Sequence, residues 1–476
     1  MAAESAMSVE RERILQLNEA PLRSGAKYVL YWSQMNRRVE SNQGLLYSVE
    51  IANQLALPVL YYEGLTCSYP HANDRLHTFI LEGVPDTAKQ LKKAGIGYCF
   101  YLRKRRADRN DVLYELARYA AAVVTDDYPT FVARKHNNHV PQKLALPYIV
   151  VDSSCIVPMR NMEKREFAAY TIRPKIQRSL PIYLKPADAL KVARRFTGDE
   201  PRFHQEVTVN NVAKLVSECE IDHSVAPSIS FRGGAIQAQK HLKFFLSNNL
   251  RRYARHRNEP EEHATSNLSA YLHFGHISSL QAALGAKQFA QSRKLVADEF
   301  LEELIVRREL AFNYARFADD PASLDNLPDW TQRNMEKHAK DRRPYTYSAA
   351  QLEAAETSDQ LWNASQKELL LRGKIHGYYR MYWGKKILEW SPTYKQAAQT
   401  MVNFHDRYAL DGRDPNTYTN ILWCFGLHDR AWGERPVFGK IRYMSLEGMK
   451  RKTRWQAYIE EIRLLEKTGN DPHRIV

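Results

Sequence analysis

The chain has 476 residues, a formal net charge of +15 at pH 7 and a hydrophobic share of 44%. This length predicts two or three domains with ample core, and the hydrophobic share excludes a chain that is disordered throughout. The basic surplus favours a polyanionic partner, nucleic acid before an acidic membrane. Composition alone leaves a merely soluble basic protein still open.

Cysteine usage is typical of a reducing compartment. The five cysteines are scattered and form no C-x-x-C pair, which argues against a disulfide framework and against a zinc site. We therefore expect no bound metal and an intracellular protein, cytoplasmic or nuclear according to its organism. No apolar run has the length of a membrane span, and the N-terminus lacks the apolar core of a secretory signal, so no membrane partner is expected.

The first part of the chain alternates apolar runs of strand length with helical patterns. Residues 1–25 are expected to form an N-terminal extension with a short helix over 10–17, and residues 26–152 an α/β domain. The predicted strands are 27–32, 58–62, 96–102, 122–125 and 147–151, and the predicted helices are 45–55, 84–94 and 112–121. This alternation predicts a doubly wound parallel sheet with helices on both faces. Polar residues follow two strands, at 33–37 and 126–128, which is a weak signal of a pocket at the strand ends.

The second part reads as a connector followed by an all-α domain. Residues 153–226 are irregular, and Pro174 is expected to break any long helix within 166–175. Residues 227–476 follow helical spacing almost throughout, as at Ala238, Leu242 and Phe245. We find no internal repeat and no low-complexity tract.

The stretch from Trp362 to Trp432 holds five of the eight tryptophans of the chain. A packed helical core is the competing interpretation, because large aromatic side chains are usually buried. Trp383 and Trp390 are seven residues apart and therefore share one helix face. That face also carries Arg380 rather than a clean aliphatic stripe, which favours a functional site.

The motifs of this stretch occur in a distinctive order: W-N-A-S-Q, H-G-Y-Y-R-M-Y-W, I-L-E-W, D-G-R-D-P-N and H-D-R-A-W-G-E-R. In this order the sequence resembles the class II cyclobutane pyrimidine dimer photolyases of the photolyase/cryptochrome family, from about Lys27 to Tyr458. The resemblance implies the photolyase/cryptochrome fold, with FAD in the helical domain and UV-damaged DNA as partner. It also implies a monomer, and an N-terminal domain that could hold an antenna chromophore of the 8-hydroxy-5-deazaflavin type.

The segment S-N-L-S offers hydroxyl and amide groups at a helix start, where a phosphate can bind. Taken alone it is more often an ordinary helix cap. The resemblance implies that it cradles the FAD diphosphate, that Arg308 is a further phosphate partner, and that an arginine–aspartate pair lies against the flavin ring. The residues implied to bind the cofactor are Tyr253, Ser266, Asn267, Leu268, Ser269, Arg308, Arg380, His405, Asp411 and Asp414.

Glu303 would ordinarily form a surface salt bridge with Arg307, one turn away. By resemblance it hydrogen-bonds the flipped-out pyrimidines, with Met381 and Trp423 as apolar walls. The role of Arg307 stays open, although we group it with the DNA-binding residues. The basic C-terminal part suits a DNA backbone, and a solvated charged face is the alternative. By resemblance Arg430 and Arg442 approach the gap left by the lesion.

Three tryptophans match the electron relay through which photolyases reduce their flavin. They are Trp383, Trp362 and Trp390, and the sequence does not give their order. With Glu303 they make up the residues that we expect to take part in catalysis.

The sequence departs from the family at two places. His405 stands where an asparagine normally lies near the flavin, and the loop W-C-F-G-L-H-D is one residue short, which puts the placement of Trp423 in doubt. A histidine is bulkier, can be a cation and titrates near neutral pH. We therefore form the hypothesis that His405 alters which flavin redox state is stable.

These observations predict a lyase that splits cyclobutane pyrimidine dimers with blue light. The first alternative is a cryptochrome-like flavin photoreceptor with weak or no repair, supported only by His405 and the short loop. The second is a basic DNA-binding module without a flavin, which would be colourless.

Overall fold

The computed structural model describes residues 8–199 and 201–475, and its first half is built around a six-stranded sheet. The strand order is β1-β6-β5-β2-β3-β4, and all neighbours are parallel except β1, which runs antiparallel to β6. The strands are β1 (Ile14–Gln16), β2 (Tyr28–Ser33), β3 (Val59–Thr66), β4 (Gly97–Arg103), β5 (Ala120–Asp126) and β6 (Tyr148–Val151). The predicted α/β sheet is confirmed.

Helices cover both faces of this sheet. One face packs on α1 (Gln43–Gln54) and α3 (Val84–Ala94), and the other on α4 (Val112–Ala117). The central strands β2 and β5 are buried along their whole length, which is why their sequences are continuous apolar runs rather than alternating ones. The next helix is α5 (Phe131–His139).

The predicted helix over residues 10–17 is wrong. The segment forms a short 3-10 turn (Arg11–Arg13) and then β1, which pairs with the edge strand β6. The Arg13 side chain is buried and donates hydrogen bonds to the backbone carbonyls of Asp152, Cys155 and Ile156. Tertiary pairing with the sheet edge therefore overrides the local helical pattern.

The expectation that Pro174 breaks the connector helix is also wrong. Helix α6 (Ala169–Tyr183) contains both Pro174 and Pro181. Pro174 removes the hydrogen bond to the carbonyl of Tyr170, a residue that is 65% exposed, so that water can take its place. The opposite face of α6 is held by buried Ile172 and Ile176. The connector also contains α7 (Val212–Ser217).

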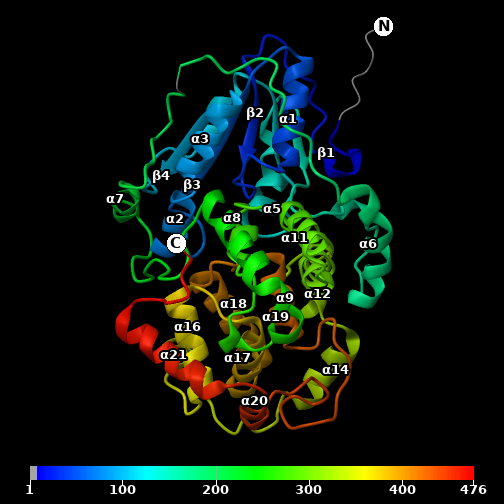
Figure 1. Ribbon diagram of the computed structural model, residues 1–476, viewed down its shortest axis with the longest axis vertical. Coiled ribbons are helices and arrows are strands. Elements are labelled where there is room, and N and C mark those ends of the chain that lie inside the picture. Colours follow the sequence, from blue (N-terminus) through cyan, green and yellow to red (C-terminus); the bar gives the residue numbers. More distant parts are fainter. Residues whose placement is uncertain (1–7, 200, 476) are drawn as a thin grey trace.

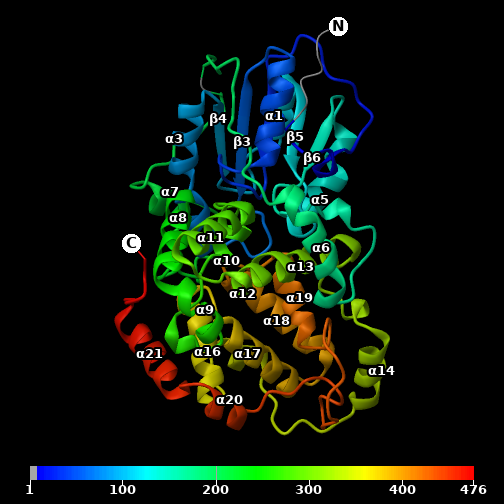
Figure 2. The same ribbon diagram turned by 45° about the vertical axis from the view of Figure 1, so that its right-hand side comes forward.

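The second half is helical, and Figures 1 and 2 show it below the sheet. Its helices are α8 (Ala235–Phe244), α9 (Leu250–His256), α10 (Ser269–His273), α11 (Ser279–Arg293), α12 (Asp298–Leu301), α13 (Arg308–Phe317), α14 (Asp329–His338), α15 (Ala349–Glu353), α16 (Gln360–Arg372), α17 (Gly377–Trp390), α18 (Tyr394–Tyr408), α19 (Pro415–Trp423), α20 (Leu446–Lys452) and α21 (Trp455–Thr468). Two π-helical segments interrupt this series, Phe245–Asn249 and Glu302–Arg307. The predicted all-α C-terminal region is confirmed.

The two halves are joined by buried polar contacts. Arg75 of α2 (Asp74–Leu81) donates hydrogen bonds to the carbonyls of Leu369 and Tyr408, at 2.9 and 2.8 Å. The Tyr128 hydroxyl, just beyond β5, donates to Asp414 of the helical half at 2.8 Å. Buried hydrogen bonds of this kind fix how the two halves pack.

None of the described helices combines the length and the hydropathy that crossing a bilayer requires.

Candidate active site

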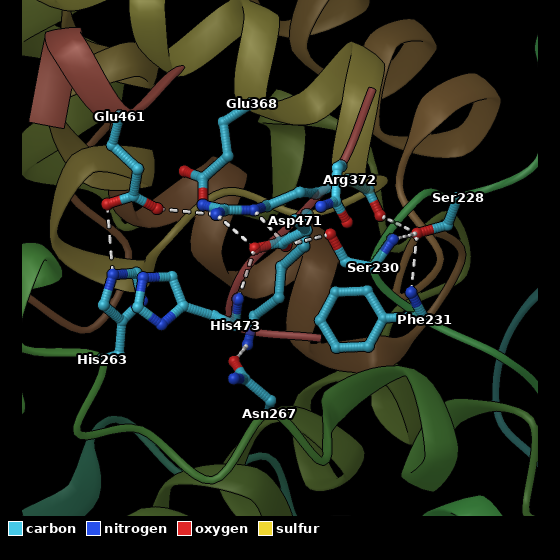
Figure 3. Close-up of polar contacts among 12 residues, drawn as sticks. Ser228, Ser230, Phe231, His263, Asn267, Glu368, Arg372, Glu461, Asp471 and His473 are labelled. Atoms are coloured by element: carbon cyan, nitrogen blue, oxygen red, sulfur yellow. Dashed lines mark hydrogen bonds and ion pairs between the residues drawn. The ribbon is translucent and has the colours of Figure 1, made fainter. Parts of the chain in front are cut away.

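A pocket lies between the loop before α10, the end of α16, the start of α17 and the C-terminal tail. Its lining includes Phe231, His241, Asn267, Lys374 and His376. Figure 3 shows polar contacts around it, with Phe231, Asn267 and His473 labelled. Asn267 belongs to the segment expected to hold the diphosphate, so one of the predicted cofactor residues faces this space.

Several buried polar atoms around the pocket lack a protein partner. His241 Nδ1 and His376 Nε2, which line it, and Arg380 Nε, near Lys374 and His376, make no hydrogen bond among the described residues. Buried polar groups are almost always paired, so unpaired ones gathered in one region indicate a polar ligand. A diphosphate and a flavin ring offer the acceptors and donors that these atoms need. The residues present therefore fit an FAD.

Lys374 is a residue of this pocket that the sequence reasoning missed. Its Nζ donates a hydrogen bond to Asn267 Oδ1 at 2.5 Å, and burial lowers its pKa to about 8. No carboxylate forms an ion pair with it among the described residues. A partly buried ammonium beside a predicted phosphate loop suits an anionic ligand. The sequence carried no clear signal for it, since Lys374 stands two residues before the motif that contains Arg380, in the loop between α16 and α17.

The predicted pair of Arg380 and Asp411 is present. Arg380 Nη2 lies 3.1 Å from both carboxylate oxygens of Asp411, and both side chains are mostly buried. Burial alone would raise the pKa of Asp411, but Arg380 and Lys374 together hold it below its usual value. The carboxylate therefore stays ionised, and the arginine is oriented by it with Nε left unpaired.

His405 lies next to this pair, but its expected titration near neutral pH is wrong. Burial, and then the charge of Arg380, lowers its pKa to about 4. Its Nδ1 donates to the Met401 carbonyl at 2.9 Å, so in the neutral ring Nε2 is the bare acceptor. The ring is also edge-on to Trp383, with 5.1 Å between centroids.

The three tryptophans predicted to form the relay lie in one continuous row. Trp383 and Trp362 are parallel within 3°, with ring centroids 6.4 Å apart, and Trp362 and Trp390 are 5.5 Å apart. Since His405 touches Trp383, the order outward from the Arg380 pair is Trp383, Trp362 and Trp390. All three are at most 3% exposed, and the partly exposed Tyr347 follows 5.1 Å from Trp390.

Glu303 has a partner other than the expected one. Its carboxylate pairs with Arg257 at 2.5 Å, while Arg307 pairs with Glu302 at 3.2 Å, so the salt bridge one turn along the helix does not form. Tyr253 lies in the same group, and burial raises its pKa to about 12. The π-helical segment Glu302–Arg307 explains the mismatch, because it shifts the phase of side chains around the helix.

Arg308 and Asp414 lie away from the pocket, at the boundary between the two halves. Arg308 donates to the Ser154 carbonyl at 2.7 Å. Asp414 accepts from the Tyr128 hydroxyl and the Asn416 backbone N–H, at 2.8 and 2.9 Å, so it caps α19 and ties the halves together. The contacts of both residues are structural, and neither lines the pocket described above.

The residues expected to bind DNA form an exposed aromatic and basic group. Arg442 lies 4.0 Å from the ring of Trp432 and 5.4 Å from that of Trp423, and Arg430 lies 4.8 Å from Trp432. Asp429 holds Arg442 in place at 2.9 Å. Met381, next to Arg380 on α17, is partly exposed. Leu268 is buried, whereas Ser266 is half-buried.

A second, apolar pocket lies at the carboxyl ends of the strands, where polar residues at 33–37 and 126–128 were only a weak signal of a pocket. It is lined by Met35, Leu76, His77, Phe131 and Phe274 among others. Both ring nitrogens of His77 are buried without a hydrogen-bond partner among the described residues, and burial lowers its pKa to about 4. A flat ligand with a polar edge would satisfy this ring.

The whole chain is similar to proteins of known activity. A protein from Methanothermobacter thermautotrophicus named deoxyribodipyrimidine photo-lyase is 40% identical over 459 residues, which cover 96% of this chain and 99% of that protein. The chain belongs to the DNA photolyase family. Proteins of the same name from Arabidopsis thaliana and Potorous tridactylus are 34% and 33% identical, covering 97% and 93% of this chain and 94% and 82% of theirs. The DNA photolyase family model matches residues 29–192.

Solved structures support the same fold. A class III photolyase from Agrobacterium tumefaciens has a TM-score of 0.68 at 17% identity, covering 95% of both chains. A cryptochrome from Synechocystis has a TM-score of 0.65 at 14% identity, covering 94% of this chain and 91% of its own. The predicted photolyase/cryptochrome fold is therefore confirmed. Proteins of this family bind a flavin.

Proposed function

We propose that this protein is a class II photolyase that repairs cyclobutane pyrimidine dimers in DNA with blue light. The observation that carries the proposal is the row of Trp383, Trp362 and Trp390, which begins beside His405 and the pair of Arg380 and Asp411. A row of buried, closely spaced indoles that starts at a polar pocket suits electron transfer into a light-absorbing cofactor. The exposed group of Arg442, Trp432 and Arg430 supplies a face for DNA.

The pocket residues would hold FAD, which supplies the light absorption and the electron that splits the dimer. Lys374, Asn267 and Ser269 are placed to bind its phosphates through an ammonium, an amide and a hydroxyl. Arg380, oriented by Asp411, has its Nε free for the ring. Since Arg308 and Asp414 lie at the boundary between the halves, we propose that they act on the site only by fixing that boundary.

Glu303, held by Arg257, is the group that we propose to hydrogen-bond the flipped-out bases. Its carboxylate is 40% exposed, so a ligand can reach it. Met381 and Trp423 would provide apolar contact, and the ammonium of Lys385 lies 4.8 Å from the Trp423 ring and fixes its position. Arg307 remains a proposed DNA contact, because its guanidinium is 51% exposed.

His405 is the residue that we propose to tune the flavin. Because its Nδ1 is committed to Met401, a neutral His405 offers an acceptor through Nε2, whereas an asparagine could also offer a donor. We expect His405→Asn to change the flavin spectrum recorded during photoreduction. Identical spectra for the two proteins would remove His405 from this role.

The apolar pocket around His77 is where we propose that an antenna chromophore binds, of the 8-hydroxy-5-deazaflavin type. The unpaired nitrogens of His77 would meet its polar edge. Adding such a deazaflavin to the purified protein should quench the fluorescence of the added chromophore by energy transfer to the flavin. His77→Leu should weaken that binding, and unchanged binding would place the chromophore elsewhere.

The second proposed function is a cryptochrome-like photoreceptor, which the replacement of asparagine by His405 favours. Repair of an oligonucleotide with one thymine dimer distinguishes the two. Under anaerobic blue light the photoreduced protein should restore dimer-free DNA, with none restored in the dark, and Glu303→Ala should repair more slowly. A flavin-bearing protein that binds the lesion without repairing it would support the photoreceptor.

A further inference from the structure

The indole N–H groups of the two inner relay tryptophans both end on neutral oxygen atoms. Trp383 Nε1 donates to Gln366 Oε1 at 2.9 Å, and Trp362 Nε1 donates to the Trp383 carbonyl at 3.0 Å. Gln366 is fully buried and lies one helical turn after Trp362 on α16. These two hydrogen bonds join α16 to α17, and they also determine which atom accepts each indole N–H.

The orientation of the Gln366 amide is fixed from its other end. Its Nε2 donates to the Glu353 carbonyl at 3.2 Å, so Oε1 is the atom turned to Trp383. The nearby Glu353 carboxylate forms an ion pair with Arg407 at 2.7 Å and accepts a hydrogen bond from the Tyr408 hydroxyl. Among the described residues, no carboxylate or imidazole accepts a hydrogen bond from either indole.

The acceptor matters because an indole that has lost an electron becomes a strong N–H acid. If a base lies at the nitrogen, the proton leaves and the electron vacancy is trapped on that ring. An amide oxygen can accept a hydrogen bond but not the proton. It therefore stabilises the positive charge while leaving the vacancy free to move.

We infer that Gln366 is a positioning residue that keeps Trp383 protonated while an electron passes through it. This inference rests on the proposed photoreduction of a bound flavin. In the step, Trp383 would lose one electron, which a bound, light-excited flavin would take up, and would keep its N–H proton. Trp362 then gives an electron to Trp383, which is restored, and no proton moves at either ring.

The test uses a protein in which the vacancy cannot leave Trp383. In a Trp362→Phe background, flash excitation of the oxidised flavin should produce a Trp383 radical whose absorption spectrum reports its protonation. With Gln366 present, the spectrum should be that of the radical cation from pH 6 to pH 9. If the radical-cation spectrum is replaced by that of the neutral radical within this pH range, while Gln366 is present, the inference is overturned.

Gln366→Glu then introduces a base of the same shape. One carboxyl oxygen would face the Glu353 carbonyl, so at low pH the acid is protonated there and imitates glutamine. The charged and titratable groups around it are Glu353, Arg407 and Tyr408, while His405 on the other side of Trp383 stays neutral. As the pH rises, the neutral Trp383 radical should appear and persist. The same spectrum as Gln366 at every pH would contradict the inference.

Two further variants keep the test decisive. Gln360→Glu makes the same change at an exposed position of the same helix and should leave the spectra unchanged. Gln366→Leu, with Trp362 intact, should lower the photoreduction yield by roughly fivefold, which corresponds to the loss of one ordinary hydrogen bond. An unchanged yield in Gln366→Leu with normal flavin content would also overturn the inference.

Failure of the proposed function would look different. Repair by chemically reduced flavin bypasses the relay, so the Gln366 variants should repair a thymine dimer as fast as the unmodified protein does. If the unmodified protein repairs no dimer, the proposed function is wrong. The radical spectra would still test whether Gln366 keeps Trp383 protonated.

Discussion

Two groups of tryptophans in the helical half have opposite surroundings. Trp362, Trp383 and Trp390 are at most 3% exposed and pack on one another, and the first two donate to neutral oxygens. Trp432, 36% exposed, instead lies under the guanidinium groups of Arg430 and Arg442. A cation above a ring opposes removal of an electron from it but attracts phosphate. Lys386 Nζ lies 5.5 Å from the outermost ring, Trp390, so the contrast holds for Trp362 and Trp383. The same residue type thus suits electron transfer in one place and DNA binding in the other.

Breaking the inner group should have the largest effect. Trp383→Phe should reduce photoreduction of the flavin to background, because Phe cannot replace the indole as electron donor next to the pocket. Bleaching of the oxidised flavin under blue light with an external reductant measures this. Trp432→Phe is the matched control from the outer group, which consists of Trp432 with Arg430 and Arg442, and its flavin should be photoreduced normally. Loss of photoreduction in this variant too would contradict the distinction between the two groups.

The inner and outer ion pairs should also differ in energy. Asp411→Ala leaves the mostly buried Arg380 without its partner, and we expect a loss of about 3 kcal/mol in the free energy of unfolding. Asp429→Ala frees the half-exposed Arg442 and should cost about 1 kcal/mol or less. Denaturant unfolding of both flavin-bearing proteins measures the difference, and equal losses would count against the buried character of the inner pair.

Acidification should lower the free energy of unfolding through His405, which packs against Trp383 of the inner group. Its pKa falls from 6.5 to about 4 on folding, so below pH 6.5 the unfolded chain takes up a proton that the folded protein refuses. Stability is therefore lost as the pH falls, and the loss levels off near pH 4. At pH 5 this residue should account for about 2 kcal/mol.

His405→Asn provides the measurement for this effect. The variant should match the original protein in unfolding free energy at pH 8 and exceed it at pH 5. The same difference at both pH values would show that His405 does not titrate as its burial requires.

The outer group should show the smallest effect, confined to DNA binding. Arg442→Ala should weaken binding to damaged DNA about tenfold at low salt and reduce the salt dependence by about one phosphate contact. Arg118→Ala removes a charge from the sheet domain that is still more exposed, 70% against 37% for Arg442, and should change neither quantity. Binding titrations at several salt concentrations decide between these outcomes.

The fold was largely predictable because its central strands are unbroken apolar runs. The segment around Arg13 was not, because its strand exists only through pairing with β6. Pro174 misled for a similar reason, since buried Ile172 and Ile176 hold the helix despite the missing hydrogen bond. Local sequence carries neither of these long-range contacts.

The site was predictable where a residue belongs to a motif and poorly predictable where its burial decides its chemistry. The pair of Arg380 and Asp411 formed as expected, and the order of the tryptophans followed once their positions were known. The neutrality of His405 depends on the charges packed around it. Gln366 was missed because an amide on a helix has no distinctive spacing, and Lys374 was missed because nothing in the sequence of the loop between α16 and α17 shows that a lysine there lines a pocket.

The most direct test compares two ways of reducing the flavin before the same repair assay. Protein reduced by light and protein reduced by dithionite should both restore an oligonucleotide with one thymine dimer under anaerobic blue light, and neither should do so in the dark. Trp383→Phe should repair only after dithionite. If dithionite-reduced protein with bound flavin leaves the dimer intact in the light, the account of this protein as a photolyase is wrong.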